Sequence, residues 1–223
     1  MFRNMSEWIE TFRSRKAIFL HDRNPDRPHP LLSGEDHSDS FFNSELVTQD
    51  PILMEEAVSD LVSLLHSTGC DLKRPDRVVG PAMGAIVLAH DIARHIGHLR
   101  TRRCLSSYTE KKPDGVMRFG RTQITPGEIV LLCEDTVTRG KSLEKTAKAV
   151  EDAGGILMPY VMVLMNRSDL KEVGGRKILA LADHPMPIWK PEQEGCELCN
   201  LGSRAIRPKT PPENWQRLNA EYR

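Results

Sequence analysis

The segment from residue 129 to residue 154 constrains the fold of this chain more than any other. It opens with a short, entirely apolar run, Ile129 to Cys133, and continues with two acidic residues and a loop of hydroxyl residues and glycine. Residues 142–153 then place apolar side chains at helical spacing, and Gly154 follows them. A short apolar strand that leads through a loop into a helix is typical of parallel sheets, whose strands are buried on both faces.

The rest of the chain alternates in the same manner between apolar runs and helical patterns. This alternation predicts the α/β class, with a mostly parallel sheet flanked by helices. One helix is expected to begin at Pro51 behind an Asp50 N-cap and to end before Gly69. Besides 129–133, the expected strands cover residues 40–43, 77–79, 104–109, 158–165 and 178–182, and the other expected helices cover 7–16, 85–96 and 142–153.

The composition divides the chain into three segments. Residues 1–50 hold the first helix and a polar loop at 21–39, and residues 51–185 hold the α/β core. Residues 186–223 contain Pro and Cys without a clear periodicity. We expect this C-terminal extension to be irregular and to contribute no core element.

The formal charges balance, with 31 Lys and Arg against 31 Asp and Glu. This balance argues against binding of nucleic acid or a membrane surface through a bulk field. No stretch approaches the roughly 20 apolar residues of a membrane-spanning helix, and residues 1–12 lack the apolar run of a signal peptide. The five Cys residues, an odd number without secretory features, indicate reduced thiols. We therefore expect a cytoplasmic protein that holds anionic ligands with local groups.

Glu134 and Asp135 stand where the apolar strand is expected to end, at the edge where open α/β sheets bind ligands. The loop behind them would direct backbone N–H groups and the positive end of the next helix toward a phosphate. Thr138, Lys141 and Ser142 would add side-chain donors. Carboxylates beside a phosphate need a neutral or cationic partner, which ribose hydroxyls and Mg²⁺ would supply. The alternative is that the acidic pair only caps a turn.

Residues 130–142 resemble the diphosphoribosyl-diphosphate signature of the type I phosphoribosyltransferases. A nucleoside-triphosphatase loop would need another glycine five residues before Gly140, and this chain has none there. The resemblance implies that Glu134 and Asp135 hold the 2- and 3-hydroxyls of the ribose in 5-phosphoribosyl 1-diphosphate. It also implies that the following residues hold the 5-phosphate, namely Thr136, Val137, Thr138, Arg139, Gly140, Lys141 and Ser142.

Two further segments resemble the orotate phosphoribosyltransferase branch of this family. The first, a turn at residues 81–84, would bind pyrophosphate through its backbone N–H groups. Residues 108–118 resemble the mobile catalytic loop, whose cations would close over pyrophosphate in the transition state. The alternative for this loop is a solvated hairpin with surface lysines. The residues of the turn are Pro81, Ala82, Met83 and Gly84, and the cations are Lys111, Lys112 and Arg118.

The parts that would bind the base also resemble that branch. Ser33-Gly34, followed by residues 38–43, resembles the base-binding hood segment at its N-terminus. Arg167 matches an arginine that pairs with the orotate carboxylate, a task that suits the planar guanidinium group. The chain departs from enteric-type enzymes at Leu32 and Gly84, where they carry Lys. Its catalytic loop is short and has no His between the cations, and acidic residues follow Gly34.

The resemblance covers roughly residues 30 to 185 and implies orotate phosphoribosyltransferase activity. The reaction would give orotidine 5-monophosphate and pyrophosphate in pyrimidine nucleotide biosynthesis, through an oxocarbenium-like transition state. It implies Mg²⁺ as cofactor, Asp135 and the loop cations as catalytic residues, and a homodimer with shared active sites. No nucleic acid and no membrane is expected as a partner. The alternatives are a phosphoribosyltransferase for another base, purine or pyrimidine, and a non-catalytic phosphoribosyl-fold regulator, although no helix-turn-helix pattern is visible.

Cys196 and Cys199 form a CxxC pair in the C-terminal extension. Such a pair supplies two of the roughly four ligands that zinc needs. His184 is a candidate third ligand, and Cys70, Cys104 or a second subunit is a candidate source of the fourth. The alternative is a pair of structural thiols. A redox role is disfavoured because the CxxC pair does not begin a helix after a strand.

Three of the eight histidines lie in the polar loop of residues 21–39. Their spacing matches no metal-binding template, so we expect them to be solvated. These residues are His21, His29 and His37. We accordingly assign no metal ligand among the site residues.

Overall fold

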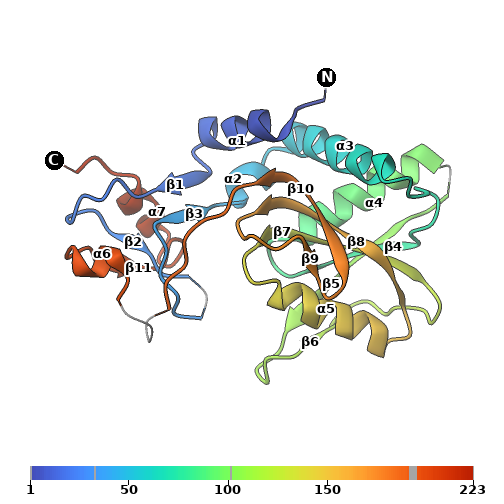
Figure 1. Ribbon diagram of the computed structural model, residues 1–223. Helices are drawn as coiled ribbons and strands as arrows, with labels where there is room; N and C mark the ends of the chain where they lie inside the picture. Colours follow the sequence, from blue (N-terminus) through green and yellow to red (C-terminus); the bar gives the residue numbers. More distant parts are fainter. Residues whose placement is uncertain (1, 33, 101, 191–194, 223) are drawn as a thin grey trace. The chain divides into compact units, whose positions relative to one another are not determined.

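The computed structural model describes residues 2–32, 34–100, 102–190 and 195–222. The chain forms two compact units, and each is described by itself (Figure 1). The first unit comprises residues 1–11 and 44–184, and the second comprises residues 12–43 and 185–223. Most of the N-terminal segment and the whole C-terminal extension therefore belong to one unit, although the sequence separates them.

The first unit is built on a seven-stranded sheet. Five neighbouring strands run parallel, and a short antiparallel strand lies at each edge. This arrangement confirms the predicted α/β class with a mostly parallel sheet. In their order across the sheet, the strands are β6 (Met117–Arg118), β5 (Leu105–Lys111), β4 (Arg77–Pro81), β7 (Ile129–Val137), β8 (Ile156–Asn166), β10 (Arg176–Asp183) and β9 (Glu172–Val173).

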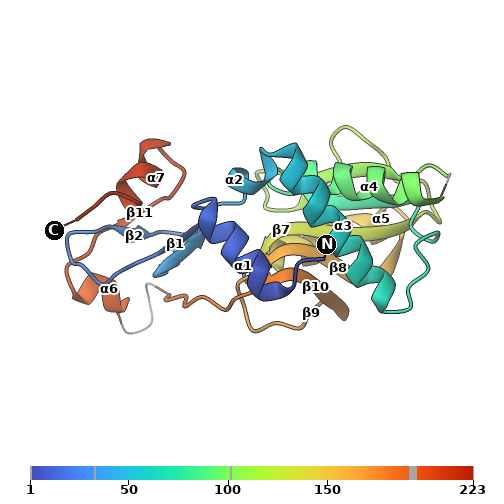
Figure 2. The ribbon, with the colours of Figure 1, turned by 90° about the horizontal axis from the view of Figure 1, so that it is seen from above.

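Helices cover both faces of this sheet. Helices α3 (Pro51–Ser67) and α4 (Ile86–Arg100) contact each other and lie on one face, and α5 (Lys141–Asp152) lies on the opposite face (Figures 1 and 2). Among the described residues, no helix has the length and apolar character needed to cross a membrane. Beneath α5, the core contains Val79, Val130, Leu132, Leu143, Val150 and Val163.

The predicted start of α3 is confirmed in detail. The Asp50 side chain accepts hydrogen bonds from the backbone N–H groups of Ile52 and Leu53, at 3.1 and 3.2 Å. Past the other end, Gly69 adopts a positive φ of 79°, which glycine adopts most readily. The start and the end of this helix are therefore encoded locally.

Helix α1 (Met5–Ser14) begins two residues before the predicted range 7–16 and also ends earlier. A capping box fixes its start, because the N–H of Glu7 donates to Asn4 Oδ1 and the N–H of Asn4 donates to Glu7 Oε2. Lys16 has a positive φ of 55°, which is incompatible with a continued helix. Apolar spacing alone did not indicate either boundary.

Helix α4 extends four residues beyond the predicted range 85–96 and ends at Arg100. The guanidinium group of Arg100 donates to the backbone carbonyls of Lys73 and Arg103, at 2.7 and 2.8 Å. These hydrogen bonds anchor the last turn, and the bond to Lys73, 27 residues away, is not indicated by any local pattern.

The second unit contains two small sheets. Strands β1 (Ile18–Leu20) and β3 (Ser40–Phe42) pair antiparallel, which confirms the strand expected at 40–43. Strand β2 (His29–Pro30) pairs parallel with β11 (Ala205–Ile206) of the C-terminal extension. The small core of this unit contains Phe19, Phe41, Ile206, Trp215 and Leu218.

The prediction that residues 186–223 are irregular and contribute no core element is wrong. Besides β11, this segment forms α6 (Glu197–Asn200) and α7 (Glu213–Leu218), and Leu198 and Leu218 are buried. Elements of two to six residues are too short to display a hydrophobic period, which explains why the sequence did not reveal them.

Candidate active site

The sequence suggested that the strand ends at the acidic pair. In the structure the pair instead lies inside strand β7. β7 runs to Val137 because β8 continues beside it, with Glu134 opposite Val163 and Thr136 opposite Met165. Only then does the chain leave the sheet and enter α5. The carboxylates are therefore positioned by the rigid ladder of a parallel sheet and not by a flexible turn.

Gly140 forms the junction between β7 and α5. It is the N-cap of the helix with a positive φ of 69°, and a Cβ at this position would lie 2.8 Å from Val173 Cγ2. Both facts require glycine here. The loop before it and the first turn of α5 thus present backbone N–H groups at a helix N-terminus, the arrangement that binds phosphate groups.

The side chains of the predicted phosphate loop fall into two groups. Thr136, Thr138, Arg139 and Ser142 are half-buried and Lys141 is exposed, so their side chains reach the surface of the loop. The Val137 side chain is fully buried in the core beneath α5, which leaves only its backbone to face a ligand.

Glu134 and Asp135 have different environments although they are adjacent. Glu134 is only 8% exposed, and burial together with the neighbouring Asp135 raises its pKa well above the usual range. Asp135 is half-buried, and its Oδ2 accepts a hydrogen bond from the Ser44 hydroxyl. Ser44 is a residue that the sequence patterns missed, because nothing near it in the chain marks it as a partner of Asp135.

The predicted pyrophosphate turn meets this acidic pair. The turn follows β4 and leads into α4, and a Cβ added to Gly84 would lie 2.6 Å from the Asp135 carboxyl group. Gly80 is equally constrained, since its Cβ would lie 2.9 Å from the Cys133 carbonyl oxygen. The turn contains a cis peptide bond between Ala82 and Met83. The structure therefore brings together the acidic pair and the turn that the sequence had singled out separately.

Pro81 and Met83 lie at the two extremes of exposure in this turn. Pro81 is the last residue of β4 and is buried, whereas Met83 is 81% exposed. Ala82 donates its backbone N–H to the Thr109 carbonyl at 2.7 Å and is half-buried.

The segment predicted as a mobile catalytic loop forms the hairpin of β5 and β6. Lys111 pairs with Met117 across the hairpin. Lys112 Nζ lies 2.8 Å from Glu110 Oε2, and Arg118 Nη1 lies 2.7 Å from Asp114 Oδ2. Such exposed ion pairs contribute only about 0–1 kcal/mol, so a diphosphate could compete for these cations.

The tip of the hairpin touches helix α5. Lys145 Nζ donates to the Gly115 carbonyl oxygen at 2.6 Å. This contact places the cationic hairpin beside the helix whose N-terminus follows β7. No sequence pattern indicated it, because Lys145 is one of several polar residues on the exposed face of the helix.

Arg167 directly follows β8, and its backbone N–H donates to the Val137 carbonyl at 3.0 Å. The residue therefore stands at the same edge of the sheet as the acidic pair. Its side chain is only 2% exposed. Its pairing with a carboxylate of the substrate stays a prediction.

Apart from Arg167, the residues predicted to bind the base belong to the second unit. Ser33 lies outside the described residues, and Gly34 has a positive φ of 91°. Ser38 Oγ donates to the Pro187 carbonyl at 2.6 Å, and the side chain of Leu32 is buried. Leu32 is thus a core residue of its unit, which explains an apolar residue at this position.

The expectation that the three loop histidines are solvated is wrong. His29 is fully buried, and His21 and His37 are half-buried. The pairing of β2 with the C-terminal strand β11 encloses His29, and a contact of this kind between distant segments leaves no trace in local spacing.

Comparison with known proteins agrees with this geometry. A family model described as the phosphoribosyl transferase domain matches residues 49–179. An orotate phosphoribosyltransferase from a Nitratiruptor species is 30% identical over 193 residues, which cover 81% of this chain and 90% of that protein. One from Heliobacterium modesticaldum is 31% identical over 201 residues, covering 90% of this chain and 95% of that protein.

A solved structure has the same fold. The crystal structure of orotate phosphoribosyltransferase from Aeropyrum pernix matches with a TM-score of 0.58 at 18% identity. The match covers 79% of this chain and 93% of that one. The likeness extends the sequence comparison to the arrangement of sheet and helices.

Proposed function

Because the chain belongs to the phosphoribosyltransferase family, we propose that it transfers the 5-phosphoribosyl group of 5-phosphoribosyl 1-diphosphate to orotate. The products are orotidine 5-monophosphate and pyrophosphate. One observation carries the proposal: Asp135 lies against the backbone of Gly84, beside the loop that opens α5. A ribose-binding carboxylate, a pyrophosphate-binding turn and a phosphate-binding helix terminus thereby serve one substrate.

The chemistry is a displacement at the anomeric carbon of the ribose through an oxocarbenium-like transition state. Glu134 and Asp135 hold the ribose hydroxyls, and the residues from Thr136 to Ser142 hold the 5-phosphate. Cations of the hairpin, Lys111, Lys112 and Arg118, face the charge that develops on pyrophosphate. No covalent nucleophile is needed, because rate comes from alignment of the two substrates and from charge stabilisation.

Mg²⁺ is part of the proposal, and the donor set fits it. Glu134 and Asp135 offer the hard oxygen ligands that this ion prefers. Burial and the adjacent Asp135 raise the pKa of Glu134, so a nearby cation would favour the ionised pair. When bound with the diphosphate, the ion neutralises charge on the leaving pyrophosphate.

The direct test is an assay with 5-phosphoribosyl 1-diphosphate, Mg²⁺ and orotate that follows the loss of orotate absorbance. We expect turnover with orotate, and we expect Asp135→Asn to lower kcat on the order of a hundredfold. Asp152→Asn, at the distal end of α5, is the matched control and should keep the wild-type rate. Turnover with adenine or uracil but not with orotate would overturn the base assignment, and wild-type kcat in Asp135→Asn would overturn the site.

The proposal also includes a homodimer with shared active sites and a cytoplasmic location. The resemblance of the hairpin to a loop that reaches a neighbouring site supports the dimer, which sedimentation equilibrium would measure directly. The five cysteines are free thiols, which agrees with a reducing compartment.

A further inference from the structure

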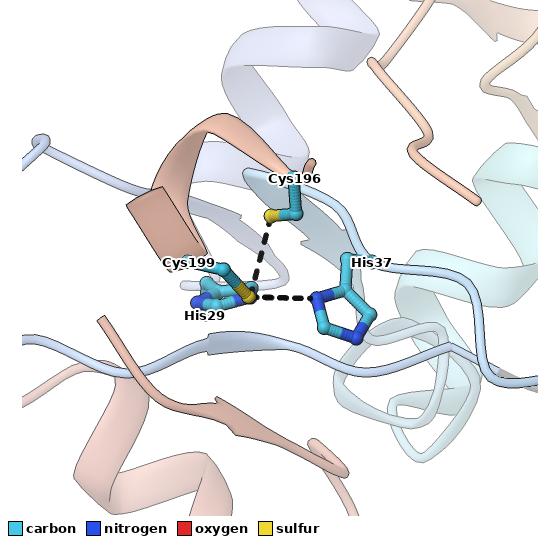
Figure 3. Close-up of side chains that lie close together, drawn as sticks. All are labelled: His29, His37, Cys196 and Cys199. Carbon is cyan, nitrogen blue, oxygen red and sulfur yellow. Dashed lines mark hydrogen bonds between the residues drawn. The ribbon is translucent and has the colours of Figure 1, made fainter. Parts of the chain in front are cut away.

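Four side chains of the second unit meet at one point: His29, His37, Cys196 and Cys199 (Figure 3). Each offers one ligand atom, and these atoms lie within 4.8 Å of one another. Cys196 stands 167 residues after His29 in the sequence, so folding brings the group together. All four residues lie outside the range 49–179 that the family model matches, and the function proposed above leaves them unexplained.

The distances between these atoms are those of ligands around a single ion. His29 Nε2 lies 3.5 Å from Cys196 Sγ and 3.6 Å from Cys199 Sγ. His37 Nδ1 lies 3.3 Å from Cys199 Sγ and 3.0 Å from His29 Nε2. Tetrahedral zinc, with bonds of about 2.0–2.1 Å to nitrogen and about 2.3 Å to sulfur, separates nitrogen from sulfur by about 3.5 Å and two nitrogens by about 3.3 Å.

The hydrogen bonds around His29 direct a lone pair toward this point. Ser203 Oγ donates its hydrogen to the Arg27 carbonyl at 2.6 Å, so it can only accept from His29 Nδ1, at 2.8 Å. Nδ1 therefore carries the ring hydrogen, and Nε2 presents its lone pair to the cysteines. A histidine whose second nitrogen donates to an oxygen is the usual metal ligand.

The other ligands are held in place by the backbone. His37 and Trp189 exchange two backbone hydrogen bonds of 2.8 Å each, and Cys196 is the N-cap of α6. His29 and Cys196 are buried, His37 is half-buried and Cys199 is exposed. An ion can therefore enter from the Cys199 side and be enclosed by the other three ligands.

We propose that His29, His37, Cys196 and Cys199 bind one zinc ion in a structural site. Two sulfur and two nitrogen ligands in a tetrahedron select zinc among common metals, and four protein ligands leave no open position for catalysis. The second unit has roughly 70 residues, and units of this size commonly need a metal or disulfides beside their small core. The ion links the β2 region to α6 and so joins the two segments that form the unit.

Metal analysis of the full-length protein, purified without chelators, tests the proposal. We expect about one equivalent of zinc per chain by plasma mass spectrometry. Replacement by Co²⁺ should give the visible absorption of a tetrahedral site with thiolate ligands. Cys199→Ser should lose the metal, whereas Cys70→Ser, which changes a thiol of the first unit, should retain it.

Wild-type protein that binds neither zinc nor Co²⁺ when reduced would overturn the proposal, and so would zinc retained in full by Cys199→Ser. A Cys196–Cys199 disulfide in protein without metal would identify the pair as structural or redox-active thiols instead. If Cys199→Ser fails to fold, the metal content of the wild type still decides. Neither readout depends on phosphoribosyl transfer, so the outcome is independent of the proposed activity.

Discussion

At the scale of single residues, Gly84 shows how closely the active site is packed. A Cβ there would lie 2.6 Å from the Asp135 carboxyl group, so Gly84→Ala must displace that group. We expect kcat to fall about tenfold or more, because small displacements of aligned groups are costly in catalysis, with little change in Tm. Steady-state kinetics and thermal melting would measure both. Gly97→Ala in α4, where the nearest atoms would be 3.7 Å away, is the control and should leave kcat unchanged.

Single residues also show which features of the structure the sequence could reveal and which it could not. Asp50 and Gly69 act through their own local geometry, and both were identified correctly as helix boundaries from the pattern around them. Ser44 and His29 act through partners that are distant in sequence, Asp135 and the C-terminal cysteines. Such pairings become visible only when the fold is known, because no local period or spacing encodes them.

At the scale of elements, three strands of the sheet, β5, β4 and β7, are joined near their amino ends by contacts of one buried arginine, Arg77. Arg77 at the start of β4 donates from Nε to Glu128 Oε2 at 2.7 Å, just before β7, and from Nη1 to Ser107 Oγ of β5 at 2.7 Å. The hydrogen bonds from Arg77 lower the pKa of Glu128 below its ordinary value of 4.5. The pair therefore stabilises the fold fully above about pH 4.5, and this contribution is lost as the pH falls through the lowered pKa.

Glu128→Gln tests this pair. We expect a loss of roughly 1.5–3 kcal/mol at neutral pH, the usual cost of a hydrogen bond to a charged group, and a smaller decline of Tm toward acid pH than in the wild type. Thermal melts of both proteins from neutral to acid pH would measure the loss of stability and the pH dependence of Tm. Glu56→Gln removes an exposed pair with Arg3 and should change stability by no more than about 1 kcal/mol. An unchanged acid dependence in Glu128→Gln would show that other carboxylates dominate.

Elements also mark the limit of prediction from periodicity. The expected long strands and the helices that cover the sheet are all present, because each helix displays several turns of its pattern and the strands β7, β8 and β10 each contain a continuous apolar run. β7 proved longer than its apolar run, since its carboxyl half is held by pairing with β8 and not by hydrophobicity. The elements of the C-terminal segment were missed because each has six residues or fewer.

At the scale of the whole molecule, the two units should respond differently to loss of the proposed zinc. Removal of the ion by a strong chelator should speed amide hydrogen exchange in residues 12–43 and 195–222, because metal binding stabilises only the folded form of the unit. Exchange in β7 and β8, in the first unit, should not change. Peptide-resolved exchange measured by mass spectrometry would separate the two. Equal acceleration in both units would indicate general unfolding, and no acceleration would exclude a structural role for the ion.

The make-up of the second unit has a consequence for biosynthesis. Strand β2 and the loop histidines are synthesised before the seven-stranded sheet, but their partners β11 and α6 are synthesised after it. All strands of the seven-stranded sheet are synthesised in between, so that sheet can form before β2 has its partner strand β11. Nascent chains would therefore pass through a stage in which His29 and His37 are exposed and the cysteines do not yet exist. Completion of this unit, and any uptake of metal by it, therefore follows the synthesis of the whole seven-stranded sheet.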